Sequence, residues 1–537
     1  MIVVIGSIGA VTRIISPFVK NKFSDPAVLV IDADAKFILP LLGSHSAGGE
    51  KLSLELADYL GGKAIQTGYV SSKGLLSLDS FGEDWGWKRN NNVELWRELV
   101  INHSKGTKIL IEQVSGTNIW RESNSAKRMI KINNNQPQSI TIGPLSVNNC
   151  SWHPPTLWVG IGCERNTSKS LLLRSLQETF HQAGLSMDAI AGLATIDFKL
   201  NEPALKIYAE NEKLPIRTFS SEMLSGVHVP TPSEVVMNEV GTPSVSEAAA
   251  ILASGEGGKL LTKKRIFKSN INEKGAVTVA VAESLHPFAP QRGELHLIGI
   301  GPGDLSSLTF EAKSSLARCV AWIGYSLYLD LLDPIIRDDQ VRIESKLTCE
   351  KERCLQAIQL AQQGVKVALI SSGDVGIYGM AGIALEMYMK YPESHRPLLH
   401  IKPGISAVQK AASLIGCPLM NDFCIISLSD LLTPWQVILK RIQGAIQGDF
   451  VVAFYNPKSK ERYWQLDEAF KLLKENRSGK TPVALARQVG RKDEEIRLFT
   501  LDDLPLEQVD MLSVVVVGNS SSYIKEGVFI TPRGYLN

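Results

Sequence analysis

The sequence of 537 residues lacks the cysteine patterns of a disulfide framework or a zinc site. Its seven cysteines form no C-x-x-C pair and show no zinc-ligand spacing with the nine histidines. No uninterrupted apolar run reaches the ~18 residues that a membrane helix needs. The apolar start at residues 1–5 is too short and too uncharged for a signal peptide. We therefore expect a cytoplasmic protein without membrane contact or protein-bound metal.

The chain also carries little net charge. The formal net charge is only +2, and charged residues make up 21% of the sequence. Without a basic excess there is no general electrostatic attraction to nucleic acid or anionic lipid, so small molecules are the expected partners. A chain of this length is too long for one hydrophobic core and predicts roughly three or four domains.

The front of the chain divides into segments by composition and periodicity. Residues 1–80 alternate β-branched runs with helical stretches, which predicts a small parallel α/β domain. Residues 81–155 are rich in asparagine, serine and proline and predict a less regular middle domain. A second α/β domain is expected over residues 156–283. The proline-containing residues 284–293 predict an interdomain linker.

The rest of the chain predicts two α/β lobes, residues 294–410 and 411–537, with a cleft between them. Strands in the first lobe are each followed by a glycine-containing loop and a helix, and a second set of strands and helices follows. The expected fold class is therefore multidomain α/β with a bilobed C-terminal part.

The strand that opens the first lobe ends in a glycine-rich loop. From Glu294 the sequence reads E-L-H-L-I-G-I-G-P-G-D, and its alternating glycines allow close approach of a ligand. A dinucleotide-binding loop needs the spacing G-x-G-x-x-G, but Asp304 stands where the third glycine belongs. Pro302 also removes an amide donor that a pyrophosphate would bind. A nicotinamide cofactor is therefore disfavoured.

Four such loops follow strands in this part of the chain, at the sheet edge where ligands of α/β proteins bind. They are residues 299–304 (G-I-G-P-G-D), 371–378 (S-S-G-D-V-G-I-Y), 403–407 (P-G-I-S-A) and 453–457 (A-F-Y-N-P). Each alone is a common turn. In this order they resemble the tetrapyrrole methylase family over essentially all of residues 294–537. The strings S-G-D-V-G-I-Y-G-M-A, Y-N-P-K-S and T-P-R-G-Y are most similar to the precorrin-3B C-17 methyltransferases.

The resemblance implies a two-lobed enzyme that transfers a methyl group from S-adenosylmethionine (SAM) to a tetrapyrrole ring carbon and contracts the ring. Because the sulfonium of SAM is already activated, alignment supplies most of the acceleration. By position, the residues implied to line the SAM site are Pro302, Ser372, Gly373, Asp374, Ile377, Ser406, Ala407, Asn456 and Gly490.

Asp304 is implied to face the tetrapyrrole and is our catalytic candidate in this half. Asp304 and Asp374 have an alternative role as caps of the helices that follow them. Basic groups would hold the acidic side chains of the macrocycle. The candidates are Lys458, Lys460, Arg462 and Arg487, for which solvated surface charge is the alternative.

The front of the chain resembles the cobalt-precorrin-5A hydrolase family. The resemblance lies in L-L-G-S-H-S-A-G-G near residue 45 and in three strings of the third segment, namely G-I-G-C-E-R-N-T, I-D-F-K-L-N-E-P and G-T-P-S-V-S-E-A-A-A. It implies hydrolysis of a δ-lactone on the contracted macrocycle with release of acetaldehyde. Serines and threonines in these strings can also simply cap helices.

Lactone hydrolysis needs a general base for water and donors for the developing oxyanion. We expect His45 as base, with Glu50 or Arg13 as helper and the amides near Gly48 and Gly49 as donors. The alternative for His45 is that the serines beside it merely cap a helix. Cys163 is a rival nucleophile, disfavoured because no histidine is placed to activate it.

The main hypothesis is a fused enzyme of cobalamin synthesis, with a hydrolase in front of a methyltransferase. The resemblance implies that cobalt arrives inside the substrate and that the methylase part forms a homodimer. Members of the hydrolase family usually carry a further βα segment before the strand at Met1. This departure favours a second hypothesis, in which residues 1–283 are a non-catalytic tetrapyrrole-binding or docking module. A third hypothesis is methylation of diphthamide or ribosomal RNA, and the low net charge disfavours RNA.

Overall fold

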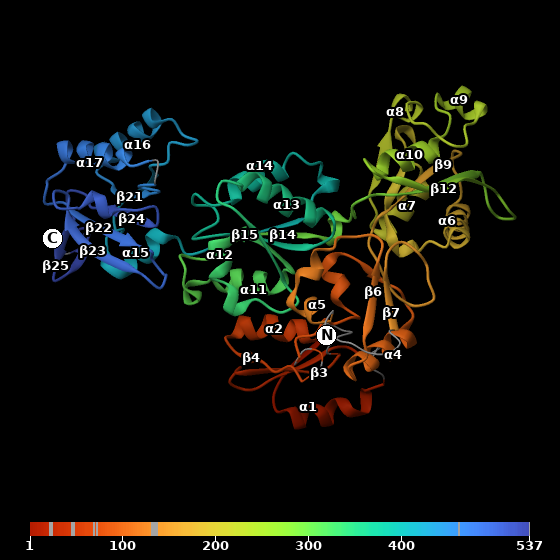
Figure 1. Cartoon of the computed structure of the whole chain (residues 1–537), viewed down its shortest axis with the longest axis horizontal. Coiled ribbons are helices and arrows are strands. Elements are labelled where there is room, and N and C mark those ends of the chain that lie inside the picture. The colour runs from red at the N-terminus through yellow and green to blue at the C-terminus, as the bar shows by residue number, and fades with distance from the viewer. Residues whose placement is uncertain are drawn as a thin grey trace.

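The computed structural model of the chain describes residues 1–20, 25–43, 49–67, 70, 73–129, 138–459 and 462–535. These residues form a chain of α/β units (Figure 1), which we call the first, middle and third domains and the first and second lobes. The two lobes and the third domain lie along the long axis, and the first domain lies below the first lobe. No helix of the described residues is both long and apolar enough to cross a membrane.

The first domain is a four-stranded sheet between two helices. The sheet has the order β1-β2-β3-β4, with β1 (Ile2–Ile5), β2 (Val28–Ile31), β3 (Phe37–Leu42) and β4 (Lys63–Ala64). Strands β2 and β3 pair antiparallel, contrary to the expected parallel sheet, because the turn between them is too short for a crossover.

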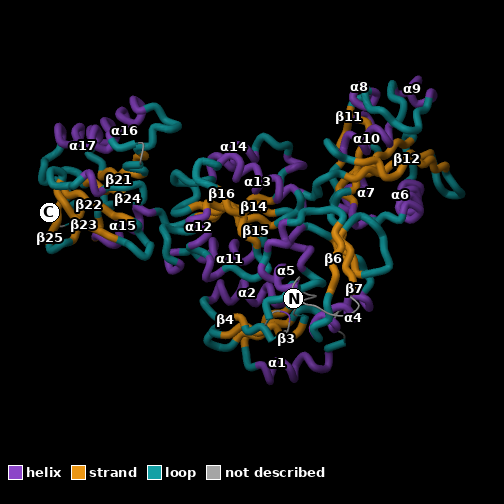
Figure 2. Tube along the Cα trace, in the orientation of Figure 1, coloured by secondary structure: helices purple, strands orange, loops and turns teal. Residues whose placement is uncertain are grey.

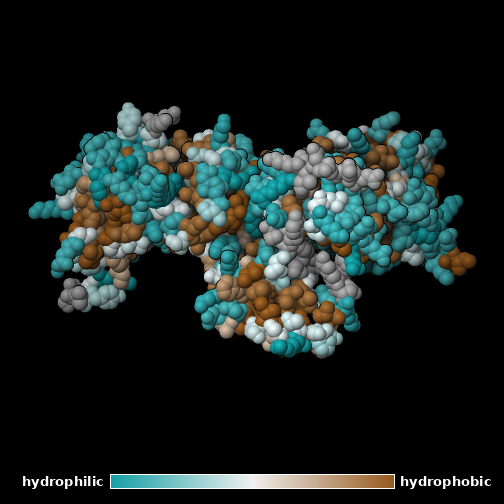
Figure 3. Space-filling view, turned by 60° about the horizontal axis from the view of Figure 1, so that its bottom comes forward, coloured by the Kyte–Doolittle hydropathy of each residue, from teal (hydrophilic) through white to brown (hydrophobic). Residues whose placement is uncertain are grey.

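Helices α1 (Ile8–Ile15) and α2 (Gly49–Leu60) cover opposite faces of this sheet. Val11 of α1 packs with Val28 and Val30, whereas Ala57 of α2 packs with the alternate residues Leu29 and Ile31. Apolar side chains also gather on the surface of this domain (Figure 3), where Ile2, Ile5, Ile14 and Phe18 are exposed.

The middle domain has a four-stranded sheet of order β5-β8-β7-β6. Its elements are β5 (Lys88–Arg89), α4 (Val93–Ser104), β6 (Ile109–Gln113), α5 (Asn124–Met129), β7 (Gln138–Ile142) and β8 (Cys150–His153). Its core is built around tryptophans such as Trp96 and Trp152 and is continuous with that of the first lobe, since Leu295 and Leu360 belong to the same cluster. These two units therefore share one hydrophobic core.

The third domain has a five-stranded sheet of order β11-β10-β9-β13-β12, in which β9, β10 and β11 are parallel. Its strands are β9 (Leu157–Cys163), β10 (Ile190–Ile196), β11 (Ile216–Phe219), β12 (Lys259–Lys268) and β13 (Ala276–Glu283). Its helices are α6 (Lys169–Ala183), α7 (Pro203–Glu212), α8 (Ser221–Ser225), α9 (Glu234–Val240) and α10 (Val245–Ser254).

The segment after β13, expected as a linker, is packed against both neighbours. The ring of Phe288 lies 5.5 Å from that of Trp158, and Ala289 is fully buried. Arg292 donates to the carbonyl of Gly86 at 2.9 Å. The prolines of this segment thus mark a fixed connection between domains.

The first lobe is a fully parallel sheet of order β16-β15-β17-β14-β18, covered by helices on both faces (Figure 2). Its strands are β14 (Glu294–Gly299), β15 (Ala321–Tyr325), β16 (Val341–Ser345), β17 (Lys366–Ser371) and β18 (Leu398–Lys402). Its helices are α11 (Phe310–Arg318), α12 (Ser326–Asp330), α13 (Glu350–Gln362) and α14 (Ala381–Tyr388). Every residue of β14 is buried, as expected for a central parallel strand.

The second lobe has a mixed sheet of order β20-β21-β24-β22-β23 and a small sheet of order β19-β26-β25. Its strands are β19 (Gly416–Cys417), β20 (Phe423–Ser427), β21 (Val451–Tyr455), β22 (Pro482–Arg487), β23 (Glu495–Thr500), β24 (Ser513–Val517), β25 (Tyr523–Lys525) and β26 (Val528–Ile530). Its helices are α15 (Ala407–Ile415), α16 (Trp435–Gln447) and α17 (Trp464–Asn476).

Candidate active site

The loops after β14 and β17 are joined by backbone hydrogen bonds. The amide of Gly373 donates to the carbonyl of Gly301 at 2.7 Å, and the amide of Gly301 donates back at 3.1 Å. Both glycines have positive φ angles, +78° and +65°, which other residues adopt at a cost. The glycine-rich loop is therefore one part of a backbone surface at the carboxyl edge of the sheet.

The carboxylate of Asp374 ties this surface to the loop after β18. It accepts from the amide of Gly376 at 2.8 Å and from the amide of Gly404 at 3.1 Å. A Cβ placed on Gly404 would lie only 2.1 Å from the carbonyl oxygen of Gly373, so only glycine fits there. Three strand-end loops thus form one hydrogen-bonded layer with little side-chain bulk.

The hydroxyl of Tyr378 connects this layer to Ser427 and its neighbours in the second lobe, where Asn456 contacts Ser427 in turn. The hydroxyl of Tyr378 donates to the carbonyl of Ile425 at 3.2 Å and accepts from the amide of Ser427 at 3.0 Å. The side-chain amide of Asn456 donates to the hydroxyl of Ser427 at 3.0 Å. Tyr378 and Asn456 both adopt left-handed backbone conformations, with φ angles of 52° and 49°. The lobes therefore meet at the loop that follows β17.

A cavity of about 440 Å³ lies where the glycine-rich loop meets the loop after β22. It is lined by Gly303, Asp304, Leu331, Lys410, Gly490, Arg491, Lys492 and Glu494. The two loops touch closely, since a Cβ on Gly490 would lie 3.0 Å from the ring of Pro302. The cavity thus presents the cationic side chains of three residues beside the carboxylates of Asp304 and Glu494.

Asp304 serves as a cap at this cavity. Its carboxylate accepts from the amide and the hydroxyl of Ser307, both at 2.8 Å, and lies 3.6 Å from Nζ of Lys410. Partial burial opposes ionisation, but the hydrogen bonds from Ser306 and Ser307 outweigh it and lower the pKa of the Asp304 carboxyl. Asp304 is therefore anionic at neutral pH and cannot act there as a general acid.

The front of the chain brings its candidates together less completely. His45 and Gly48 lie outside the described residues. Glu50 is buried in the first turn of α2 and lines a cavity of about 560 Å³ between the first domain, the middle domain and the first lobe. Arg13 is exposed on α1, across the sheet from α2. Glu50 and Arg13 therefore do not share a site.

Two further front residues bear on the hydrolysis hypothesis. Gly49 donates its amide to the carbonyl of Gly43 at 3.1 Å, so this amide is already used. Burial raises the pKa of the Cys163 thiol to about 11. A thiol that stays protonated at neutral pH is a poor nucleophile, which argues against Cys163.

Comparisons with known proteins divide the chain in the same way. Residues 1–70 match the family described as Cobalamin synthesis G N-terminal, residues 157–282 match Cobalamin synthesis G C-terminus, and residues 294–505 match Tetrapyrrole (Corrin/Porphyrin) Methylases. A probable cobalt-factor III C(17)-methyltransferase of Salmonella typhimurium is 50% identical over 241 residues, which cover 45% of this chain and 99% of that protein. The chain belongs to the tetrapyrrole methylase family.

Other relatives agree with this assignment. A precorrin-3B C(17)-methyltransferase of Sinorhizobium sp is 39% identical over 249 residues, covering 45% of this chain and 97% of that protein. The crystal structure of the methyltransferase CobJ is 34% identical and covers 45% of this chain and 100% of that chain, with a TM-score of 0.43. The family matches and the curated relatives confirm the resemblances in both halves: this tetrapyrrole methylase is an enzyme fused behind cobalamin synthesis G domains.

The residues predicted for SAM lie on or beside the strand-end loops of the two lobes, and Gly490 among them also lines the 440 Å³ cavity. Pro302, Gly373, Asp374 and their neighbours Ser372 and Ile377 lie on the two joined loops. Ser406 is buried and caps α15, which begins at Ala407, while Asn456 and Gly490 come from the second lobe. The side chains of Asp374 and Ser406 are already engaged within the protein, so these two positions would offer a ligand mainly their backbone.

The basic residues expected to hold the macrocycle have other partners. Lys458 donates to the carbonyl of Leu506 at 2.7 Å, and Arg487 pairs with Asp510 at 2.9 Å and with Glu495 at 2.8 Å. Arg462 donates to backbone carbonyls, and Lys460 lies outside the described residues.

Sequence reasoning missed Lys410, Arg491, Lys492 and Tyr378. The first three line the cavity, and Tyr378 bridges the lobes. The one sequence signal that could have identified Arg491 and Lys492 is that they directly follow the predicted site residue Gly490. No pattern indicated where the hydroxyl of Tyr378 would reach.

Proposed function

We propose that the two lobes methylate ring carbon 17 of a precorrin-3-type macrocycle with SAM as donor, and contract the ring. The carrying observation is the 50% identity to a cobalt-factor III C(17)-methyltransferase over nearly its whole length. The joining of the three strand-end loops of the first lobe supports it. We further propose that cobalt enters as part of the substrate.

The cleft fits SAM in its chemistry. The loops around Gly301, Gly373 and Gly404 carry little side-chain bulk, which lets an amino-acid head and an adenine approach the backbone closely, and the close packing at Gly404 leaves no room for a side chain. SAM, when bound, supplies an activated methyl group. The role of Asp374 and Tyr378 is to hold the loops and lobes so that the ring carbon lies in line with that group.

The 440 Å³ cavity supports a macrocycle carrying carboxylates. Lys410, Arg491 and Lys492 supply positive charge at its wall, and Arg491 can bind a carboxylate through two hydrogen bonds. Asp304 is held anionic beside them by Ser307. We propose that Asp304 orients these cations and keeps the glycine-rich loop in place.

The test is incubation of the full chain with methyl-labelled SAM and either cobalt-precorrin-3 or its cobalt-free form. We expect one labelled methyl group in a ring-contracted product, faster with the cobalt substrate. Label in the macrocycle only without cobalt would overturn the cobalt proposal. No label with either substrate, from protein that is folded by circular dichroism, would overturn the assignment itself.

We propose that residues 1–283 hydrolyse the δ-lactone of cobalt-precorrin-5A and release acetaldehyde. The matches of residues 1–70 and 157–282 to both cobalamin synthesis G families support this activity. The alternative remains a docking module without chemistry. Enzymatic detection of acetaldehyde separates them, because a docking module would release none above the buffer background.

We also propose that the protein is a cytoplasmic homodimer joined through its methylase lobes. Light scattering after size-exclusion chromatography measures the mass directly. A monomeric mass at micromolar concentration would contradict the dimer.

A further inference from the structure

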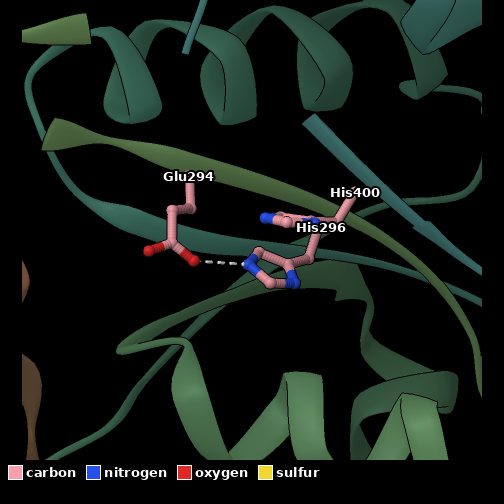
Figure 4. Close-up of side chains that lie close together, drawn as sticks. All are labelled: Glu294, His296 and His400. Carbon is pink, nitrogen blue, oxygen red and sulfur yellow. Dashed lines mark hydrogen bonds and ion pairs between the residues drawn. The ribbon is translucent and has the colours of Figure 1, made fainter. Parts of the chain in front are cut away.

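A second cluster of chemically active side chains lies in the first lobe, away from the cleft. Glu294 and His296 are alternate residues of β14, and His400 faces His296 across the pair β14 and β18 (Figure 4). One ligand atom of each residue lies within 4.8 Å of the other two. The cleft loops leave the carboxyl ends of these strands, whereas Glu294 begins β14. The cluster is therefore not part of the methyl-transfer site.

Two of the three residues of the cluster are buried and hydrogen-bonded. Glu294 and His296 are 7% and 2% exposed. Oε2 of Glu294 accepts from Nε2 of His296 at 2.9 Å, and the two imidazole rings lie 4.4 Å apart between centroids. Arg318 of α11 donates to both oxygens of Glu294, each at 2.6 Å, a two-pronged pairing that requires an ionised carboxylate.

The protein leaves ligand capacity in this cluster unused. Within the described residues, Nδ1 of His296 is buried without a hydrogen-bond partner, and the ring of His400 makes no hydrogen bond. A buried nitrogen without a partner costs free energy, and native proteins seldom keep one without a reason. An ion pair kept only for stability would not need two adjacent imidazoles.

We propose that Glu294, His296 and His400 bind a divalent transition-metal ion such as Zn²⁺ or Co²⁺. Two imidazoles and one carboxylate are a preferred ligand set for these ions, and three protein ligands leave a position for water. On binding, the ion takes the place of the Nε2 proton of His296 that now points at Glu294, and the ring stays neutral by carrying its proton on the unpartnered Nδ1 instead. Arg318 stays as the outer hydrogen-bond donor that a ligating carboxylate commonly has.

The expected consequence is structural. The ion would connect the edge strand β18 to β14 and, through Arg318, to the wall of the 560 Å³ cavity below the lobe. It would be a resident ion, separate from cobalt carried by the substrate. The inference therefore does not depend on either proposed activity.

The test uses the full chain, without an affinity tag and after removal of metals by a chelator. Titration with Zn²⁺ is followed by calorimetry, and titration with Co²⁺ by visible absorption. We expect one ion per chain, d–d bands of nitrogen-ligated Co²⁺, and a higher melting temperature with Zn²⁺. His400→Ala should weaken binding by more than the ~10–100-fold that losing an outer partner costs, and R318Q by about that amount.

The matched control is His228→Ala, which removes an exposed histidine in the third domain and should leave the titration unchanged. His400 is half-buried on an edge strand, so its replacement is expected to fold, and circular dichroism checks this. Failure of the full chain to bind either ion, or binding that His400→Ala leaves intact, would overturn the proposal.

Discussion

The first lobe and the first domain place their candidate residues in different ways. In the lobe, the candidates sit on loops at the carboxyl ends of parallel strands, and the mutual hydrogen bonds of Gly301 and Gly373 join those loops. In the first domain, Glu50 and Arg13 belong to helices on opposite faces of a sheet. A site on strand-end loops can be predicted from the order of strands along the chain. A site built from helix residues can be predicted only when it is known which face of the sheet each helix covers.

The largest expected effect tests whether the stability of the methylase lobes depends on the middle domain. Trp152 is fully buried in the core that the middle domain shares with the first lobe. Trp152→Ala should cost about 3–5 kcal/mol of stability and lower the temperature at which methyl transfer is lost. Thermal denaturation followed by fluorescence and by activity measures both changes.

The matched control is Phe180→Ala, which empties a similar volume in the separate core of the third domain. It should destabilise that domain and leave the heat resistance of methyl transfer unchanged. If both variants lowered the heat resistance of methyl transfer equally, the shared core would not link the stability of the middle domain to that of the first lobe.

This shared core also shows where prediction from sequence ends. The strand-end loops of the lobes could be predicted because glycines and short apolar runs are local signals. The packing partners of Trp152 could not be predicted, because an apolar side chain does not indicate which element it packs against. For the same reason the prediction of an interdomain linker over residues 284–293 did not include the packing of Phe288 on Trp158.

The first sheet gives a second example. Strand β3 was missed, so the hairpin that it makes with β2 was missed too, and a parallel sheet was predicted. In the candidate site, Gly490 was predicted but the neighbouring cations Arg491 and Lys492 were not. The sequence does not distinguish a lysine or arginine that lines a cavity from one on the open surface.

The next effect separates the two activities. Asp374→Ala removes the acceptor that holds Gly376 and Gly404, so the loops of the cleft should shift. A displacement of about 1 Å at such a site can cost ~10²-fold, and we expect a loss of that size in kcat/KM for methyl transfer. Acetaldehyde release should stay unchanged. Asp374→Asn, which keeps one acceptor, should fall between, and an equal loss of both activities would contradict this separation.

A reciprocal change in the first domain should have a smaller effect. If Glu50 assists the hydrolytic base, Glu50→Gln should reduce acetaldehyde release roughly tenfold and leave methyl transfer intact. Arg13→Ala is the comparison variant, because Arg13 lies on the opposite face of the sheet and should matter little. A larger loss from Arg13→Ala than from Glu50→Gln would reverse the assignment of the helper.

The smallest effect concerns pH and the middle domain that joins the two halves. Burial lowers the pKa of His153, although its hydrogen bond to the Gly143 carbonyl at 2.8 Å partly opposes this. The folded protein therefore binds fewer protons here than the unfolded chain, whose histidine has a pKa of about 6.5. The stability that this group contributes is complete above about pH 6.5 and is lost as the pH falls through the folded pKa.

His153→Asn keeps a donor for the Gly143 carbonyl but cannot take up a proton. Its melting temperature should therefore fall less than that of the parent chain between about pH 8 and about pH 5. His103 of the same domain also has a pKa lowered by burial, so the acid sensitivity that remains in His153→Asn should fall further in the double variant. If acidification lowers methyl transfer and acetaldehyde release in parallel, the common cause lies in this middle domain. If acidification lowers only one activity, the cause instead lies in the site of that activity.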